Sequence, residues 1–428
     1  MILLQPPPGA SNTGRVRWPV NADTAGTVSA TQVLCTIRNH DGITRADISR
    51  ITGLGRSTVS QHVDTLVSGG LVVETGSARS TGGRRARLLR FRKDGGYVVA
   101  VDLGATSLDV GICNLDAEPV AVDSMEFDQT ATPNQAIESA HQMAAGLIRG
   151  MGLDFSQISG VGLGVPGPVQ FSTGTLVAPA ILRGWDKYPI ATALRERFGC
   201  AAYVDNDVNV MALGELWAGI GKGVRNFIFV KLGTGIGAGI VCEGQLYRGS
   251  QGCAGDIGHI VIDGCDVVCL CGKRGCLEAL AAGPSIARRA EAEANQRSAS
   301  VLSTLMSEHG RLTAEDVGMA ALRGDSAAAE IIRDTGRLVG RVLAKVIDFF
   351  NPSLILIGGG ISKTGDLLLA SIRESVYQQS LPLATRDLSV LPSALGDRAG
   401  IIGAAVLVLE ELYSPPAVAQ VIAQRLQQ

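Results

Sequence analysis

One imidazole and four thiols gather in one short segment of the sequence. Structural zinc sites use four histidine or cysteine ligands, and His259, Cys269, Cys271 and Cys276 would supply a closed tetrahedral set. Because such a set leaves no open position for water, we expect Zn²⁺ to fix a loop here rather than to catalyse a reaction. Cys265 is a spare thiol, so the ligand set stays open, and free buried thiols are the alternative.

Three glycine-containing turns follow apolar runs and have residue types suited to phosphate. Small side chains let backbone N–H groups approach phosphate oxygens, and a carboxylate at a strand end can bind Mg²⁺. One such turn alone fits an ordinary hairpin, but three at strand ends indicate one nucleotide cleft. The residues are Asp102, Gly104 and Thr106 in the first turn, Gly233, Thr234 and Gly235 in the second, and Gly359 in the third.

A further carboxylate stands where an apolar strand stops and a helix is expected to begin, at Asn206 and Asp207. In that position the Asp207 carboxylate can act as the base that orients and deprotonates a hydroxyl for phosphoryl transfer. The alternative is that it caps the helix, and one side chain can serve in both ways.

The amino-terminal region is basic, while the remainder is acidic. Residues 1–93 carry 13 Arg and Lys against 5 Asp and Glu, and the rest carries 25 against 35. Apolar residues at helical spacing predict three short helices between Val28 and Leu71. Thr44 is the expected cap of the second helix, and Gly53 to Gly55 form the turn before the third. This order of elements is typical of a helix-turn-helix.

The third of these helices and the segment after it have the pattern of a winged helix-turn-helix. Near its start the helix leaves polar side chains off its apolar stripe, where a recognition helix meets base edges in the major groove. Two strands, 71–75 and 86–91, would enclose a basic wing tip that contacts DNA phosphates or the minor groove. A solvated surface is the alternative for any one of these residues. The candidates for DNA contact are Arg56, Ser57, Thr58, Gln61 and His62 on the helix, and Arg79, Arg84 and Arg85 on the wing.

Length and composition indicate an α/β protein of more than one domain. The chain has 428 residues, of which 46% are hydrophobic, 18% charged and 4% aromatic. We see no apolar run of about 20 residues that would span a membrane, and no signal peptide at the start. We therefore expect a cytoplasmic protein with a flexible tail over 1–25, a DNA-binding domain over 26–93 and a larger domain over 94–428.

Together these motifs resemble the ROK family of bacterial repressors, open reading frames and sugar kinases. The resemblance extends from about Ala25 to Glu411, and its most specific part is CLCGKRGCLE at 269–278 with the upstream pair Gly258 and His259. Supporting motifs are DLGAT at 102–106, GLGVPGPV at 162–169, DNDVN at 205–209, LGTGIGAG at 232–239 and GGGIS at 358–362.

The resemblance implies an actin-like, ribonuclease-H-like two-lobed sugar-kinase fold behind the winged helix. The small lobe would comprise about 94–206 and a carboxy-terminal helix over about 399–413, and the large lobe about 207–398. A sugar would lie in the cleft with ATP beside it, and Asp207 would hold the position of the catalytic base. His259 would orient a sugar hydroxyl through the ring nitrogen that does not bind zinc. The implied sugar-binding residues are Asn206, Asp207, Asp256, His259 and Glu278.

Two positions depart from the usual pattern of the family's kinases. Ala105 replaces a glycine, and if that backbone needs a positive φ the added methyl group costs on the order of 1 kcal/mol. Asp256 replaces a glutamate and is one methylene shorter, so its contact with a sugar hydroxyl would be longer or bridged by water. The first departure bears on ATP and Mg²⁺ binding, and the second on the choice of sugar.

The leading hypothesis is a sugar-responsive DNA-binding regulator of carbohydrate genes, a repressor rather than an enzyme. Its partners would be a double-stranded DNA operator and a sugar or sugar-phosphate effector, with no membrane. Since helix-turn-helix proteins read two half-sites, we expect a homodimer or homotetramer associated with the nucleoid. The alternatives are an ATP-dependent hexose kinase with an accessory DNA-binding domain, and a scaffold regulator that answers to a protein partner.

Overall fold

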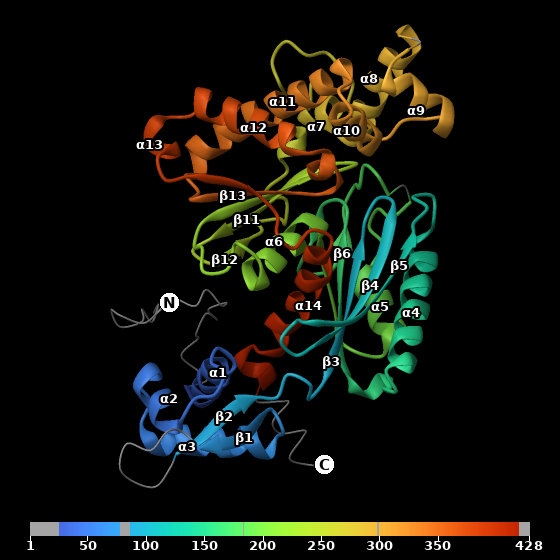
Figure 1. Ribbon diagram of the computed structural model, residues 1–428. Helices are drawn as coiled ribbons and strands as arrows, with labels where there is room; N and C mark the ends of the chain where they lie inside the picture. Colours follow the sequence, from blue (N-terminus) through green and yellow to red (C-terminus); the bar gives the residue numbers. More distant parts are fainter. Residues whose placement is uncertain (1–24, 78–85, 183, 298, 419–428) are drawn as a thin grey trace.

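The computed structural model describes residues 25–77, 86–182, 184–297 and 299–418. Its amino-terminal part is three helices followed by a two-stranded antiparallel hairpin (Figure 1). This order confirms the predicted winged helix-turn-helix. The elements are α1 (Ala25–Arg38), α2 (Arg45–Thr52), α3 (Arg56–Ser68), β1 (Val72–Ser77) and β2 (Arg87–Phe91).

Local sequence determines how these helices begin and end. The Thr44 hydroxyl accepts a hydrogen bond from the Asp47 backbone N–H, so it caps α2 as expected. Gly53 ends the same helix in the left-handed region, with φ of 73°, where a side chain would be strained. The turn between α2 and α3 therefore depends on a glycine at this position.

The first sheet has the strand order β5-β4-β3-β6-β9, in which β3, β6 and β9 are parallel. Its two faces are buried against different helices. Val99 and Val101 of β3 pack toward α4 and α5, while Val98 and Ala100 pack toward α14. The elements are β3 (Tyr97–Leu103), β4 (Ser107–Asn114), β5 (Pro119–Glu126), α4 (Pro133–Gly150), β6 (Ile158–Val165), α5 (Ile190–Phe198), β9 (Ala202–Asn206) and α14 (Arg398–Leu412).

The second sheet has the order β12-β11-β10-β13-β14 and is covered on one face by α7 to α12 (Figure 1). Its elements are β10 (Phe227–Leu232), β11 (Ile236–Cys242), β12 (Gln245–Tyr247), β13 (Leu354–Gly358), β14 (Ser389–Pro392), α7 (Leu277–Ala281), α8 (Gly283–Gln296), α9 (Val301–His309), α10 (Ala314–Leu322), α11 (Ser326–Phe350) and α12 (Asp366–Gln379). Shorter elements are β7 (Val169–Gln170), β8 (Thr175–Leu176), α13 (Pro382–Thr385), η2 (Phe155–Gln157), η3 (Ile257–His259) and η4 (Gly360–Thr364).

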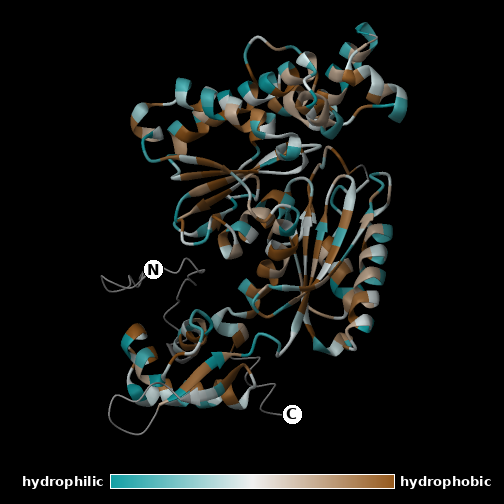
Figure 2. Cartoon of the chain, viewed as in Figure 1, coloured by the Kyte–Doolittle hydropathy of each residue, from teal (hydrophilic) through white to brown (hydrophobic). Residues whose placement is uncertain are grey.

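Two helices lie between the sheets and touch at backbone distance. They are α6 (Asp207–Ala218) and α14, and both are buried on nearly every side. A Cβ atom on Gly214 of α6 would lie 2.2 Å from the Ala399 carbonyl oxygen, and one on Gly403 of α14 would lie 1.7 Å from that of Val210. Figure 2 shows the hydrophobic colouring concentrated on the strands and on α14. Glycine at these two positions is therefore what lets the helices pack so closely.

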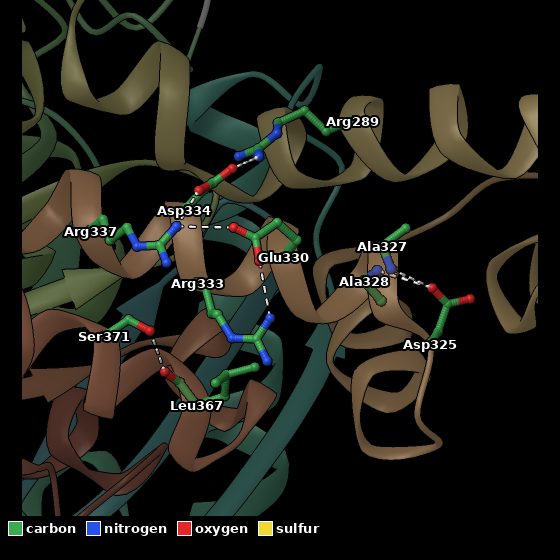
Figure 3. A network of polar contacts seen from close by, with 10 residues as sticks. All are labelled: Arg289, Asp325, Ala327, Ala328, Glu330, Arg333, Asp334, Arg337, Leu367 and Ser371. Atoms are coloured by element: carbon green, nitrogen blue, oxygen red, sulfur yellow. Dashed lines mark hydrogen bonds and ion pairs between the residues drawn. The ribbon is translucent and has the colours of Figure 1, made fainter.

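Helix α11 has a buried face against α12 and an exposed face that carries ion pairs. Arg337 contacts Glu330 and Asp334 at 3.0 Å, and Arg289 of α8 contacts Asp334 at 2.9 Å (Figure 3). The buried residues of this helix belong to the core around the second sheet. Among the described helices, none is both long and apolar enough to cross a membrane.

Candidate functional site

A cleft of ≈ 1190 Å³ opens between the two sheets, and residues from widely separated segments line it. Every residue that the sequence predicted for sugar or phosphate contact lines this one cleft. These residues are Asp102, Gly104, Thr106, Asn206, Asp207, Gly233, Thr234, Gly235, Asp256, His259, Glu278 and Gly359.

The junction of β9 and α6 brings Asn206 and Asp207 to the floor of the cleft. Asn206 is the helix cap, because its side-chain oxygen accepts from the backbone N–H groups of Val208 and Asn209 at 3.0 and 3.4 Å. Its amide nitrogen donates to the Gly167 carbonyl at 2.9 Å. Asn206, rather than Asp207, therefore caps the helix. Asp207 is the first residue of the helix, and its carboxylate lines the cleft.

Sequence reasoning missed Lys231, which lies at the end of β10 and faces Asp207. Its ammonium nitrogen donates to Oδ2 of Asp207 at 2.5 Å, and the two side chains are only 18% and 7% exposed. Burial lowers the pKa of Lys231, but the charges of Asp207 and Asp102 outweigh burial and the pKa is raised overall. The ammonium group therefore keeps its proton. The one signal in the sequence was a single lysine inside the apolar run FIFVKL.

Asp102 is the most strongly perturbed carboxyl group of the cleft. It is the penultimate residue of β3, its side chain is buried, and its Oδ1 atom has no hydrogen-bond partner among the described residues. Burial raises the pKa of Asp102 to about 7; the charge of Lys231 lowers it, and that of Asp207 raises it further. The group is thus poised to exchange a proton near neutrality.

Glu278 and the second glycine turn fit each other closely. The Glu278 carboxylate accepts a hydrogen bond from the Ile236 backbone N–H at 3.0 Å. A Cβ atom on Gly235 would lie 2.8 Å from the same carboxylate oxygen, so only glycine leaves room for it. The carboxylate is therefore held at the cleft wall by the turn that was predicted to bind phosphate.

The predicted metal ligands form a cluster behind this wall. The ligand atoms of His259, Cys269, Cys271 and Cys276 all lie within 4.8 Å of one another, and Cys265 is not among them. Nδ1 of His259 is 3.6 Å from the Cys269 sulfur, and the sulfurs of Cys271 and Cys276 are 3.7 Å apart. Two thiolates bound to one tetrahedral zinc ion are about 3.8 Å apart, so the donor set fits such an ion.

Neither departure from the kinase pattern introduces strain. Ala105 is not among the residues with positive φ, so the cost that was conditional on such a backbone does not arise. Asp256 precedes η3 at the rim of the cleft, where its side chain is exposed.

The predicted DNA-contacting residues of α3 fall into two groups. Arg56, Ser57 and Gln61 are exposed, and Thr58 is half-buried. His62 instead lies against α1, where its Nε2 is 2.7 Å from the Ser29 hydroxyl, and burial lowers its pKa. It turns inward because it flanks the buried stripe of this helix. The wing residues Arg79, Arg84 and Arg85 lie outside the described residues.

The winged helix packs directly against the rest of the chain. The Arg38 guanidinium at the end of α1 lies over the rings of Trp217 and Tyr413, 4.5 and 4.6 Å from their centroids. Trp217 donates to the Asp116 carbonyl at 3.0 Å, and the Tyr413 hydroxyl donates to that of Leu115 at 2.7 Å. The interdomain joint is this contact between Arg38, Trp217 and Tyr413.

Comparison with known proteins agrees with this architecture. Residues 98–411 match the ROK family, and residues 27–86 match the MarR family. The chain belongs to the ROK family. The predicted arrangement, a winged helix-turn-helix followed by the ROK sugar-kinase fold, is therefore confirmed.

Two kinds of ROK protein are similar to this chain. A xylose repressor of Caldicellulosiruptor bescii is 30% identical over 386 residues, which is 90% of this chain and 96% of that protein. A glucokinase of Halalkalibacterium halodurans is 35% identical over 319 residues, 74% of this chain and 96% of the enzyme. The crystal structure of a ROK family transcriptional regulator, a homologue of Escherichia coli Mlc, has a TM-score of 0.81 and 27% identity, and covers 94% of this chain and 100% of its own.

The raised pKa of Asp102 predicts a pH-dependent loss of stability. An acid that binds its proton more tightly when folded destabilises the folded state as the pH rises from 3.8 to about 7. Relative to Asp102→Asn, the wild type should lose up to about 4 kcal/mol across that window, at 1.4 kcal/mol per pKa unit. Urea unfolding at a series of pH values measures this, with the exposed carboxylate variant Asp123→Asn as control. Parallel profiles for wild type and Asp102→Asn would contradict it.

Proposed function

We propose that this protein is a sugar-responsive transcriptional repressor of carbohydrate genes. Residues 26–93 would form the DNA-binding domain, and residues 94–428 the two-lobed ligand-binding domain. One observation carries the proposal: the chain joins an exposed recognition helix to a sugar-kinase cleft, and it matches a xylose repressor over 96% of that repressor's length. The protein would act in the cytoplasm, on DNA of the nucleoid.

The DNA-binding surface would be the exposed start of α3 together with the wing. Arg56, Ser57 and Gln61 can reach base edges or phosphates because nothing in the described residues covers them. The excess of basic residues in the first 93 positions supports binding to phosphate. Two such surfaces read two half-sites, so we infer a homodimer or homotetramer on the operator.

The effector would be held by hydrogen bonds to its hydroxyl groups. The carboxylates of Asp207, Glu278 and Asp256 are acceptors for hydroxyl protons, and the Asn206 amide has one N–H left to donate. His259, which belongs to the metal cluster, also lines the cleft and would be the fifth sugar-binding residue. The name of the repressor relative makes xylose the first sugar to test, and glucose the second because of the glucokinase.

Helix α6 offers a direct connection from the cleft to the DNA-binding domain. Its first residue, Asp207, lines the cleft, and Trp217 at its other end supports Arg38 of α1. A ligand that draws the two sheets together would displace this helix and, through the interdomain joint, α1. We infer that sugar binding shifts the population toward a spacing of the two winged helices that no longer fits the operator.

Zinc would be a structural component of the ligand-binding domain. His259, Cys269, Cys271 and Cys276 would hold the ion, which supplies only cross-linking because no ligand position is left open. The cross-link would fix the loop between η3 and α7, and with it the His259 ring at the cleft.

The second candidate is an ATP-dependent hexose kinase with an accessory DNA-binding domain. The cleft position of Asp207, the glycine turns and the similarity to a glucokinase favour it. Its ATP and Mg²⁺ would occupy the side of the cleft formed by Gly104, Thr106, Gly233 and Thr234. A coupled ADP-release assay decides it: sugar-dependent ADP production that Asp207→Asn abolishes would favour the kinase over the repressor.

The repressor proposal is tested by titrating the full-length protein against labelled DNA from upstream of its own gene. Xylose or glucose should lower the operator affinity about 5- to 150-fold, the usual range of coupling between two sites. Gln61→Ala should weaken specific binding by about 1–3 kcal/mol. Arg323→Ala should not, because this exposed cation follows α10, and α10 lies at the opposite end of the molecule from α3 (Figure 1). Equal affinity for operator and random DNA would exclude the repressor, and equal affinity with every sugar would exclude sensing.

The interdomain joint predicts a variant that binds both ligands but couples them more weakly. Trp217→Leu removes the ring under Arg38 and should reduce the coupling by about 0.5–2 kcal/mol. Sugar affinity in the absence of DNA should stay near that of the wild type. The matched control is Phe349→Leu, since that aromatic ring is 91% exposed on α11. If Trp217→Leu responds to sugar as fully as the control does, α6 does not carry the signal.

The metal cluster predicts which cysteine matters for zinc. Cys271→Ser removes one of the four ligands, so the purified protein should contain less zinc and unfold at a lower temperature. Cys265→Ser should retain the full zinc content, because this thiol lies outside the cluster. Zinc is measured by elemental analysis and unfolding by calorimetry. Similar zinc contents in the two variants would rule out the assigned ligand set.

A further inference from the structure

The charged groups at the floor of the cleft come from three separate elements. Lys231 is the penultimate residue of β10 in the second sheet, and Asp102 is the penultimate residue of β3 in the first sheet. Asp207 begins α6 between them. The 2.5 Å hydrogen bond from the Lys231 ammonium to Asp207 therefore joins the second sheet to the central helix. Asp109 of β4 is near enough to add its negative charge to the field at Lys231.

In kinases, carboxylates in such a cleft face a divalent cation that also binds phosphate oxygens. Mg²⁺ is a hard cation and takes carboxylate and phosphate oxygens as ligands. Here a positive charge belonging to the chain already lies against Asp207, and it is held in place because the lysine side chain is only 18% exposed. An ammonium group has three donors and accepts nothing, so it can hydrogen-bond ligand oxygens but cannot organise a triphosphate as a metal does.

The net charge of the cleft also favours a ligand without phosphate groups. Besides Asp102, its lining includes six carboxylates, those of Asp109, Asp186, Asp207, Asp256, Glu278 and Asp397. It includes three ammonium groups, those of Lys231, Lys273 and Lys363. This excess of negative charge repels phosphorylated ligands unless a divalent cation accompanies them.

We propose that Lys231 is a built-in cation that takes the place of the divalent metal beside Asp207, so that the cleft binds a neutral, polyhydroxylated sugar without metal or nucleotide. This inference rests on the proposed use of the cleft as an effector site and narrows the effector to an unphosphorylated sugar. The Asp207 oxygens, which already accept from Lys231 and from the Val208 N–H at 2.9 Å, then serve as fixed acceptors for sugar hydroxyls. The ammonium group occupies the Oδ2 atom of Asp207 that a divalent cation would otherwise bind.

The proposal predicts that removing the lysine creates a metal site. Zinc-loaded full-length protein is titrated with Mn²⁺ and followed by electron paramagnetic resonance. The wild type should bind Mn²⁺ weakly, and Lys231→Met should bind it at least about tenfold more tightly, because Asp207 then lacks a counter-charge. Adding Asp207→Asn to Lys231→Met should abolish the new site. Lys363→Met is the matched control, because that lysine lines the same cleft, pairs with Asp397 and is 49% exposed; it should behave as the wild type.

Tight Mn²⁺ binding by the wild type that Asp207→Asn removes would overturn the proposal, and so would equal affinities in the wild type and in folded Lys231→Met. Circular dichroism shows whether that variant folds.

A second measurement uses the wild type alone: thermal shifts with D-xylose, D-glucose and glucose 6-phosphate, each with and without Mg²⁺. The neutral sugars should bind independently of Mg²⁺ and at least about tenfold more tightly than the phosphate; tighter binding of the phosphate, or a requirement for Mg²⁺, contradicts the proposal. If no sugar binds, the proposed function fails, while the Mn²⁺ titration still decides the role of Lys231.

Discussion

The close packing of α6 against α14 is the constraint on which the rest of the molecule depends. Both helices lie between the two sheets, so each sheet is positioned by contact with the same pair. The absence of side chains at Gly214 and Gly403 brings their backbones together. That contact places the start of α6 in the cleft and its end at the interdomain joint. A bulkier residue at either glycine would separate the sheets and move the cleft and the joint at once.

Much of the winged helix could be predicted from sequence because its signals are local. The Thr44 cap, the left-handed Gly53 and the short apolar stripes each act within a few residues. The sheets were different, since β10 pairs with β13, whose residues lie more than a hundred positions further along the chain. Apolar runs predicted those strands, but no local pattern indicates their order in the sheet. The resemblance to a family supplied the two-lobed fold.

The sequence predicted which residues line the cleft, but it did not predict how their charges act on one another. Glycine turns and carboxylates are recognisable by type, and the fold brought all of them to one cavity. Lys231 was missed because its role depends on Asp207, which is 24 residues away in sequence but accepts a hydrogen bond from it in the folded protein. His62 shows the same limit on a smaller scale. Its polarity suggested exposure, yet Ser29 on another helix offers it a partner.

His259 has a consequence for the direction of one hydrogen bond. Its Nδ1 atom faces the cysteine sulfurs, and the residue also lines the cleft. When Nδ1 binds a metal, the ring can carry its proton only on Nε2, so its tautomer is fixed. Toward the cleft the ring can then only donate, whereas the surrounding carboxylates accept. A ligand would therefore present an oxygen lone pair to His259 and hydroxyl protons to the carboxylates, and this polarity would distinguish sugars that are alike in size.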